Sequence, residues 1–368
     1  MTQLGAPTTF GRFFLPGPTE VRPEILAAQT RPMIGHRGKS MEQLIAQMMP
    51  GLQRIFRTSR PVYISASSAT GLMEAAVRNC GGRRILSLVN GAFSDRFYRI
   101  AQANGVEAEP LEVPLGQVHT PELLEAALRR RQYDAVTVVH SETSTGALNP
   151  IRELAQVTHR HGETLLLVDS VTGIAGAPVE SDAWELDFVL TGSQKALALP
   201  PGLALGVANA RALARAQATP LRGVYFDLVE FETYIRKQQT PNTPAVSLMY
   251  ALAAQVARIE IETIEGRWAR HRAMAERTWA WAGEMRARGL AVQVLAPEGF
   301  RSPTVSCLTL PEGRKGSEIN DQMKSRGYTI SAGYGALKDS TIRIGHMGDH
   351  TVEELDELLS VLAEVLAA

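Results

Sequence analysis

Two polar residues that follow buried-looking apolar runs are the first candidates for chemistry. Asp169 ends the run at 165–168 (LLLV), and Lys195 lies shortly after the run at 187–190 (DFVL). Ligands in open α/β sheets bind beyond the carboxyl ends of the strands, so we expect both side chains in one region. Taken alone, Asp169 could equally be a helix N-cap or turn former, and Lys195 a surface lysine.

The residues after Lys195 favour a chemical role for it. The segment 196–205 (ALALPPGLAL) is wholly apolar. A lysine in such surroundings loses solvation, which lowers the pKa of its amine and makes it a nucleophile. The chain offers few other amines, because arginine supplies most of its cations; the six lysines are Lys39, Lys195, Lys237, Lys315, Lys324 and Lys338. A lysine with a strand-end aspartate is what pyridoxal phosphate needs, one for the Schiff base and the other for the pyridine nitrogen.

A phosphate cradle is predicted at 65–76 (SASSATGLMEAA), which follows a strand-like run and opens a helix. Free backbone N–H groups at a helix N-terminus bind anions, and Ser68, Ala69 and Thr70 would face the phosphate. Ordinary N-capping by serine or threonine is the alternative interpretation.

A planar cofactor also needs a ring to stack on. The segment 90–97 (NGAFSDRF) puts Phe93 beyond another strand, although Phe93 could simply be a core residue of the next helix. The segment 140–150 (HSETSTGALNP) follows another strand-like run and brings hydroxyl groups to the same edge of the sheet. These hydroxyl groups could instead cap the loop. Four successive strand ends would thus carry the parts of one site.

The elements that must position these residues alternate between strand and helix. Strand-like runs lie at 62–65, 84–89, 134–139, 164–168, 187–190 and 203–208, with helical patterns between most of them. This alternation predicts βαβ units and a mostly parallel sheet with helices on both faces. Long helical patterns at 245–263 and 266–288 then lead into short strands and a closing helix at 351–366. We expect an N-terminal arm (1–16), a large domain (17–262) and a small C-terminal α+β domain (263–368).

Composition excludes several other functions. The formal net charge is zero, which argues against a nucleic-acid or anionic-membrane surface. The longest charge-free apolar stretch, 196–210, is too short and too interrupted by proline to span a bilayer. Cys80 and Cys307 have no metal-ligand spacing and fit a reducing compartment. The N-terminus lacks a secretory pattern, so we expect a cytoplasmic protein.

The motifs together resemble the class V aminotransferases of pyridoxal-phosphate fold type I, especially the alanine–glyoxylate and serine–pyruvate or serine–glyoxylate branch. The resemblance covers nearly the whole chain in family order, and its motifs are PGP (16–18), MIGHRGKSM (33–41), SATGLMEA (68–75), NGAFSDR (90–96), HSETSTGALNP (140–150), LLLVDSVTG (165–173), TGSQKALALPPG (191–202), NTPAVSLMYAL (242–252) and IRIGHMG (342–348). It implies a homodimer and a seven-stranded, mainly parallel sheet, of which the residues themselves reveal six strands.

The resemblance also implies a role for each matching residue. Lys195 resembles the Schiff-base lysine, Asp169 the partner of the pyridine nitrogen, and Phe93 the ring that stacks on the cofactor. Arg343 resembles the arginine that binds the substrate α-carboxylate. The implied phosphate ligands are Ser68, Ala69, Thr70 and Gln194, with Thr243 from the other subunit, and Thr143 would lie near the ring hydroxyl and the substrate. Relatives often have glycine where this chain has Ala69.

We therefore predict transfer of an amino group from alanine or serine to glyoxylate or pyruvate. A single Arg343 suits a monocarboxylic donor, whereas aspartate or phosphoserine would want a second cation, for which Arg37 is the candidate. Arg37 could instead pair with backbone carbonyl groups at a turn. A cysteine desulfurase-like lyase would need a mobile cysteine, but Cys307 lies in an apolar strand pattern (TVSCLTL). A binding protein without chemistry would not need all these parts.

Overall fold

A seven-stranded sheet forms the centre of the large domain. The computed structural model describes residues 10–368. The strand order is β1-β9-β8-β7-β4-β2-β3; only β9 runs antiparallel to its neighbours, and the other pairs are parallel. The bounds are β1 Tyr63–Ser65, β2 Arg84–Val89, β3 Glu107–Glu112, β4 Ala135–Val139, β7 Leu165–Asp169, β8 Phe188–Gly192 and β9 Ala204–Ala208. The predicted mainly parallel seven-stranded sheet is confirmed.

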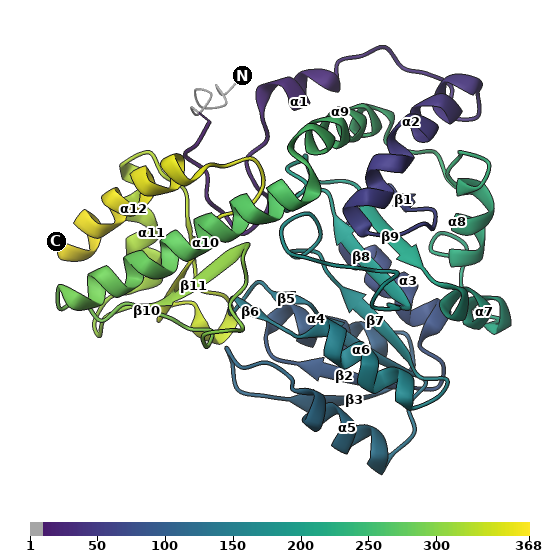
Figure 1. Ribbon diagram of the computed structural model, residues 1–368, viewed down its shortest axis with the longest axis horizontal. Coiled ribbons are helices and arrows are strands. Elements are labelled where there is room, and N and C mark those ends of the chain that lie inside the picture. Colours follow the sequence, from purple (N-terminus) through teal and green to yellow (C-terminus); the bar gives the residue numbers. More distant parts are fainter. Residues whose placement is uncertain (1–9) are drawn as a thin grey trace.

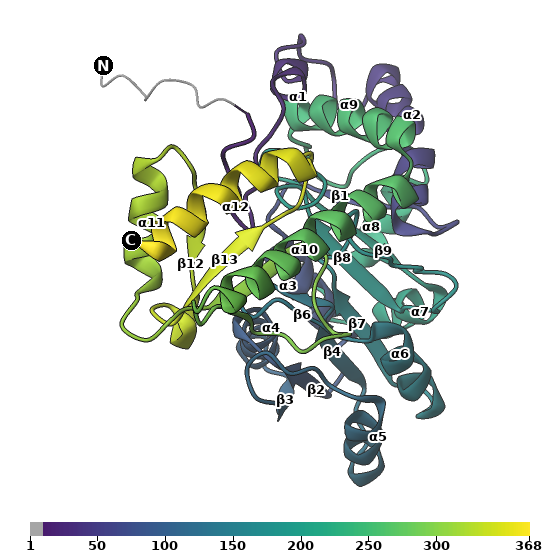
Figure 2. The ribbon, with the colours of Figure 1, turned by 60° about the vertical axis from the view of Figure 1, so that its left-hand side comes forward.

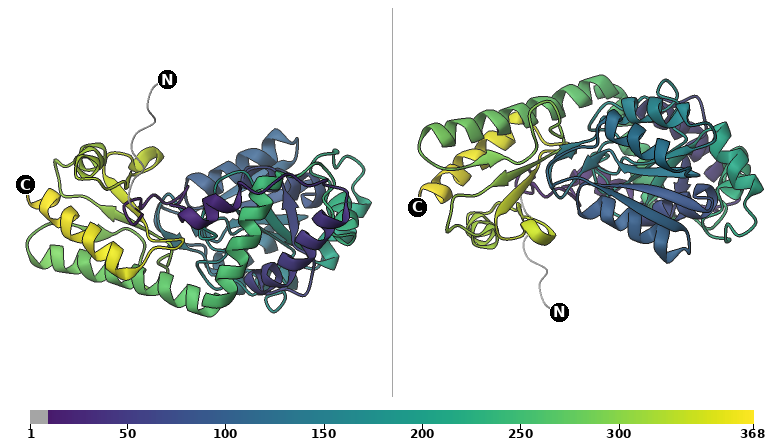
Figure 3. Two further views of the ribbon diagram at one scale, coloured as in Figure 1. Left: turned by 90° about the horizontal axis from the view of Figure 1, so that it is seen from above. Right: turned by 90° about the horizontal axis from the view of Figure 1, so that it is seen from below.

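Burial explains which strands could be recognised from the sequence. Strands β4, β7, β8 and β9 are buried along their whole length, because helices cover both faces of the sheet (Figure 3). Strand β3 lies at the edge, is largely exposed and contains a proline, which edge strands tolerate. Its sequence, EAEPLE, has no apolar run, and it is the seventh strand that only the family resemblance implied.

The remaining elements of the large domain are helices and a small hairpin. The helices are α1 Pro23–Ala28, α2 Lys39–Phe56, α3 Ala69–Cys80, α4 Ala92–Ala103, α5 Pro121–Arg130, α6 Ile151–Arg160, α7 Ala210–Ala218, α8 Leu228–Ile235 and α9 Val246–Glu262; the hairpin pairs β5 Ser141–Glu142 with β6 Ala147–Leu148. Helices α3 and α4 each follow a strand of the sheet, so their N-termini lie at its carboxyl edge (Figure 1). This edge is where the predicted site residues meet.

The small domain has its own sheet and core. A long helix, α10 (Ile264–Ala287), runs from the large domain along the small one (Figure 1). The antiparallel sheet has the order β10-β11-β13-β12 and packs against α10 and α11, and α12 packs against both helices (Figure 2). The bounds are β10 Gln293–Val294, β11 Val305–Thr309, β12 Ser331–Ala332, β13 Thr341–Gly345, α11 Gly316–Ser325 and α12 Val352–Ala367. A separate cluster of buried apolar side chains forms the core of this part of the chain.

Helix α9 ends at Glu262 and α10 begins at Ile264, with Thr263 between them. The predicted domain boundary at 262/263 stays a prediction. Residues 1–9 of the predicted arm lie outside the described residues. The rest of the arm lies on the small domain, where Phe14 is fully buried and its N–H donates to the Thr329 carbonyl at 2.8 Å. Within residues 10–368, no helix is long and apolar enough to cross a membrane.

Candidate active site

A cavity of about 210 Å³ lies beyond the carboxyl ends of β7 and β8. Residues at or just after the ends of five strands, β1, β2, β4, β7 and β8, line it, as parallel strands place their carboxyl ends along one edge. Eight of the predicted site residues are among its lining: Ser68, Ala69, Thr70, Phe93, Thr143, Asp169, Gln194 and Lys195. The other lining residues include Gly17, Pro18, Met73, Arg96 and Thr172.

Lys195 is the buried amine of this cavity. Its side chain is almost wholly excluded from solvent, and Nζ donates a hydrogen bond to the Pro16 carbonyl oxygen. Burial, together with the positive charge of Arg343, lowers the pKa of Lys195 to about 8, while Asp169 opposes the shift. A large fraction of this amine is therefore neutral near pH 8, which is the form that can act as a nucleophile or accept a proton.

Asp169 is the buried acid of the cavity, at the last position of β7. One carboxylate oxygen accepts the Val171 N–H at 2.8 Å, and within residues 10–368 no cation forms an ion pair with it. Burial raises the pKa of Asp169 to about 7, opposed by the Val171 hydrogen bond and supported by the negative charge of Glu142. Such a carboxylate has unused capacity to bind a cationic or N–H-bearing ligand group.

The N-terminus of α3 is open toward the cavity. Ser68 is the N-cap residue, but its side chain makes no capping hydrogen bond, so the N-capping interpretation does not account for it. Ala69 is buried and Thr70 half-buried, and the first turn contains no acidic side chain. A helix of this length with free N–H groups and a hydroxyl beside it suits a phosphate group.

Phe93 lies in the first turn of α4 as a half-buried wall of the cavity. Its ring centroid is 5.9 Å from the Nζ atom of Lys195 and 5.6 Å from the ring centroid of Tyr334. The hydroxyl of Thr143, on the opposite loop, is 2.6 Å from that of Thr172. The ring wall, the buried amine, the buried acid and the open helix end together fit pyridoxal phosphate, a planar group with an aldehyde and a phosphate.

Arg343 reaches the site from β13 of the small domain. It is 6% exposed, and burial lowers its pKa. Its guanidinium donates to the Ala332 carbonyl at 3.1 Å, to the Ser331 hydroxyl at 2.8 Å and to the Thr143 carbonyl at 3.4 Å. The last contact joins it to a residue that lines the cavity, so Arg343 lies beside the cavity rather than in its wall.

Two predicted residues lie away from this cavity in the same chain. Arg37 donates to the backbone carbonyl groups of Thr240 and Pro241 at 2.6 and 2.7 Å, and its guanidinium lies over the Tyr234 ring. These are contacts of the turn-pairing kind that we gave as the alternative. Thr243 is exposed and does not line the cavity of its own chain.

Three residues at the site were not foreseen. Arg96 lines the cavity with its guanidinium 4.9 Å from the Phe93 ring centroid, and Tyr334 lies between Phe93 and Arg343. Glu142 is fully buried beside them. Arg96 follows Phe93 by nearly one helical turn, and this spacing could have predicted that both side chains lie on the same face of the helix. Tyr334 lies in a glycine-rich loop, where no local pattern indicates a site.

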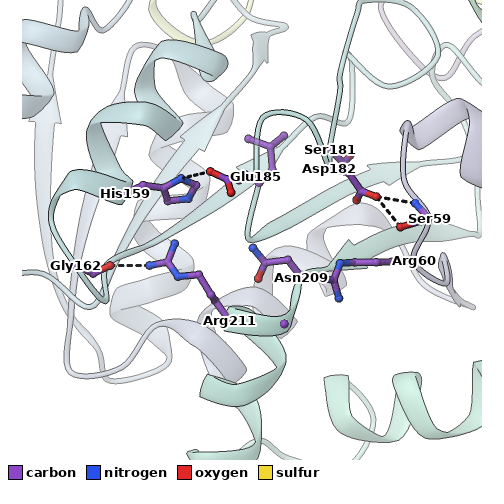
Figure 4. A pocket seen from close by; sticks show the side chains of 11 residues that line it. Ser59, Arg60, His159, Gly162, Ser181, Asp182, Glu185, Asn209 and Arg211 are labelled. Carbon is purple, nitrogen blue, oxygen red and sulfur yellow. Dashed lines mark hydrogen bonds and ion pairs between the residues drawn. The ribbon is translucent and has the colours of Figure 1, made fainter.

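A larger cavity, of about 620 Å³, lies at the opposite end of the sheet (Figure 4). Its lining includes Ser59 and Arg60 before β1, His159 of α6, and Asn209 and Arg211 after β9. Several of its polar groups are bonded to each other, as in the contacts of Asp182 with the Ser59 N–H and hydroxyl (Figure 4). None of the predicted site residues lines this cavity.

Comparison with known proteins identifies the family. The model of the aminotransferase class-V family matches residues 24–358. An uncharacterized aminotransferase from Methanocaldococcus jannaschii is 36% identical, covering 91% of this chain and 87% of that protein. The L-aspartate–glyoxylate aminotransferase of Paracoccus denitrificans is 30% identical, covering 94% and 88%. A solved alanine–glyoxylate aminotransferase from Nostoc sp. has a TM-score of 0.92 at 27% identity, covering 100% and 97%.

The chain belongs to the class V aminotransferases. It is a pyridoxal-phosphate-dependent aminotransferase of fold type I, which confirms the predicted family, fold, cofactor and enzyme class. Cys307 offers no support for a desulfurase, because it is fully buried in β11 and burial raises its pKa to about 11. A cysteine held as a buried thiol is a poor nucleophile.

Proposed function

We propose that the protein transfers the amino group of alanine or serine to glyoxylate or pyruvate. The observation that carries this proposal is Arg343, a buried arginine beside the cavity of Lys195 and Asp169. One guanidinium fork suits one carboxylate, which a monocarboxylic amino acid supplies. The contacts of Arg37 with Thr240 and Pro241 support the same conclusion, because they engage the cation that an acidic donor was expected to use.

The residues of this chain divide the chemistry among them. Pyridoxal phosphate, when bound, supplies an aldehyde carbon that combines with amines and a ring that withdraws electrons. Arg343 orients the donor through its carboxylate, and the neutral amine of Lys195 takes the proton from the donor Cα. Asp169 in its anionic form keeps a proton on the pyridine nitrogen, a partner that would favour its ionisation despite its burial. Tyr334 and Arg343 of the small domain contact the residues Phe93 and Thr143 of the cavity wall.

A homodimer is part of this proposal, with Thr243 of one subunit reaching the phosphate site of the other. Among residues 10–368, Met33, Leu221 and Val224 are large apolar side chains with most of their surface exposed. Tyr225, which directly follows Val224 in the chain, donates its hydroxyl to the Ala66 carbonyl at 3.0 Å. Ala66 lies shortly before the start of α3. An apolar surface beside the phosphate site suits a two-fold contact between copies. Light scattering gives the mass directly, and a monomer at micromolar concentration would contradict this part.

Aspartate or phosphoserine is the second candidate donor, because the cavity holds one more cation than we foresaw. No residue between 10 and 368 forms a hydrogen bond or ion pair with the guanidinium of Arg96. An unpaired guanidinium in the wall gives a second acidic group a partner. The Paracoccus relative bears the name of an aspartate–glyoxylate enzyme, so this donor is tested beside alanine and serine.

The test is a panel of amino donors against glyoxylate, pyruvate and 2-oxoglutarate. We expect alanine or serine to give the highest kcat/KM, with glyoxylate or pyruvate as acceptor. A preference for aspartate or phosphoserine of more than about tenfold, ~1.4 kcal/mol in transition-state binding, would contradict the small-donor proposal. An Arg96→Gln variant then separates the two candidates, since only an acidic donor should lose kcat/KM selectively.

A further inference from the structure

Glu142 is a fully buried carboxylate at the active site, and no role follows for it from the proposed chemistry. It belongs to the β5–β6 hairpin that follows β4, in the hydroxyl-rich segment 140–150. No lysine, arginine or histidine within residues 10–368 forms an ion pair with it, although a buried ion is costly without a partner. Its charge must therefore be balanced by hydrogen bonds and dipoles.

The N-terminus of α4 supplies one half of that balance. One carboxylate oxygen of Glu142 accepts the Phe93 N–H at 3.2 Å and the Ser94 N–H at 2.9 Å, and it also accepts the Ser94 hydroxyl at 3.0 Å. These are two of the N–H groups that a helix start leaves without intrahelical partners, where a negative charge is stabilised. The carboxylate thus fixes the turn of α4 that carries the Phe93 ring.

The loop after β5 supplies the other half. The second carboxylate oxygen accepts the Ser144 N–H at 3.1 Å and the Ser144 hydroxyl at 2.6 Å. The Ser144 hydroxyl oxygen in turn accepts the Ala92 N–H at 3.0 Å, so the loop and the helix are joined twice. Thr143, between Glu142 and Ser144, carries the carbonyl that contacts Arg343.

We propose that Glu142 is a positioning residue that sets the Phe93 ring and the Thr143 carbonyl relative to each other. Its two oxygens bind the two walls of the cavity, one that would stack on the cofactor and one that contacts Arg343. The role rests on the acceptor-only chemistry of a carboxylate, because every hydrogen bond that it makes within residues 10–368 is accepted from an N–H or O–H donor. It does not depend on which amino donor or acceptor the enzyme uses.

The decisive variant is Glu142→Gln, which keeps the shape but turns one acceptor into an NH₂ donor facing other donors. We expect cofactor-free Glu142→Gln to exchange the Phe93 and Ser94 amide hydrogens faster, and to bind pyridoxal phosphate about tenfold or more weakly. The induced visible circular dichroism of the bound cofactor should change, because it reports the orientation of the ring. Glu142→Asp keeps both acceptors and should restore part of each signal.

Asp227→Asn is the matched control. Asp227 is also a buried carboxylate at a helix N-terminus, where it accepts the Val229 and Glu230 N–H groups of α8 and pairs with Arg222 at 3.0 Å, and it does not line the cavity. It should lose stability like Glu142→Gln but keep the cofactor affinity and the dichroism. If Glu142→Gln does not fold, Ser144→Ala removes one hydroxyl of the network, and we expect the same dichroism change with a smaller loss of affinity.

Three results would overturn the proposal: cofactor affinity and dichroism within twofold of the parent in Glu142→Gln, an equal change in Asp227→Asn, or an unchanged dichroism in Ser144→Ala. The measured quantities are independent of the donor panel. A failed proposal on donor identity would therefore leave this test intact, and the reverse also holds.

Discussion

Two buried aspartates at opposite ends of neighbouring strands differ in how fully they are bonded. Asp187 precedes β8 and is completely buried, and it accepts the Leu166 N–H at 2.7 Å and the Asn209 amide at 2.8 Å, with Arg211 at 3.3 Å. Asp169 ends β7 and has a single backbone hydrogen bond, from Val171, and no ion pair within residues 10–368. Both have the same chemistry and similar burial.

This difference in hydrogen bonding assigns a structural role to Asp187 and a binding or catalytic role to Asp169. A carboxylate whose partners all come from its own chain stabilises the fold and has little capacity left for a ligand. A buried carboxylate with spare capacity and a raised pKa is typical of a binding or catalytic position. Burial alone would not separate the two aspartates, so the variants below compare them directly.

The largest expected effect is on turnover in Asp169→Asn. A neutral amide cannot keep a proton on the pyridine nitrogen as a carboxylate does, so we expect kcat to fall on the order of 10²–10³-fold. Far-UV circular dichroism should show an intact fold. Steady-state kinetics beside Asp187→Asn measures the contrast, and near-normal kcat in Asp169→Asn would refute the assigned role.

The next effect in size is that of Arg343→Ala. Loss of charge-assisted hydrogen bonds of about 1.5–3 kcal/mol should lower kcat/KM by about 10- to 100-fold. All donors share the α-carboxylate, so the loss should be similar for alanine, serine and aspartate. The donor panel measures it, and a loss confined to acidic donors would assign Arg343 to the side-chain carboxylate instead.

Stability should move in opposite directions when the two aspartates are neutralised. Asp187→Asn leaves buried donors short of an acceptor, and we expect it to lower the free energy of unfolding by about 1–3 kcal/mol. Asp169 has a pKa of about 7 in the folded chain and 3.8 as a reference, so its ionisation costs stability as pH rises through about 7.

Cofactor-free Asp169→Asn should therefore be more stable than the parent at pH 8 by about 1 kcal/mol or more, with the gain vanishing near pH 4. Urea unfolding at both pH values measures the two differences. Equal destabilisation of both variants at pH 8 would show that Asp169 is as fully satisfied as Asp187.

The smallest effect belongs to Arg37→Gln. Its partners are the carbonyl groups of Thr240 and Pro241, in the segment that leads to Thr243. With alanine as donor we expect kcat to stay within about twofold, because Arg37 is exposed and surface contacts of this kind contribute little. A selective loss with aspartate or phosphoserine would instead identify Arg37 as a specificity residue.

The sequence predicted the strands and site residues whose signals are local. Lys195 and Asp169 were recognisable because each follows an apolar run that fills a fully buried strand. Strand β3 has no such run, because an edge strand with an exposed face needs no apolar pattern. Its existence came only from the family resemblance.

The contacts between domains could not be predicted from local patterns. Arg343 contacts Thr143 across two hundred positions, and Tyr334 lies beside Phe93, through packing that no short motif encodes. Glu142 shows the same limit more clearly. The sequence places an acidic residue among hydroxyl residues after a strand, but this pattern does not predict its partners. The role of the Glu142 carboxylate depends on the N-terminus of α4, and only the folded chain brings the two together.

Reductive labelling of the lysine that carries the cofactor tests the central claim most directly. Borohydride treatment of the holoenzyme fixes pyridoxal phosphate to its lysine, and peptide mapping then identifies the position. Lys195 is the buried amine of the cavity, with a pKa near 8, among the six lysines of the chain. We predict a single labelled peptide that contains Lys195. A label on any other lysine would contradict the whole assignment of the site.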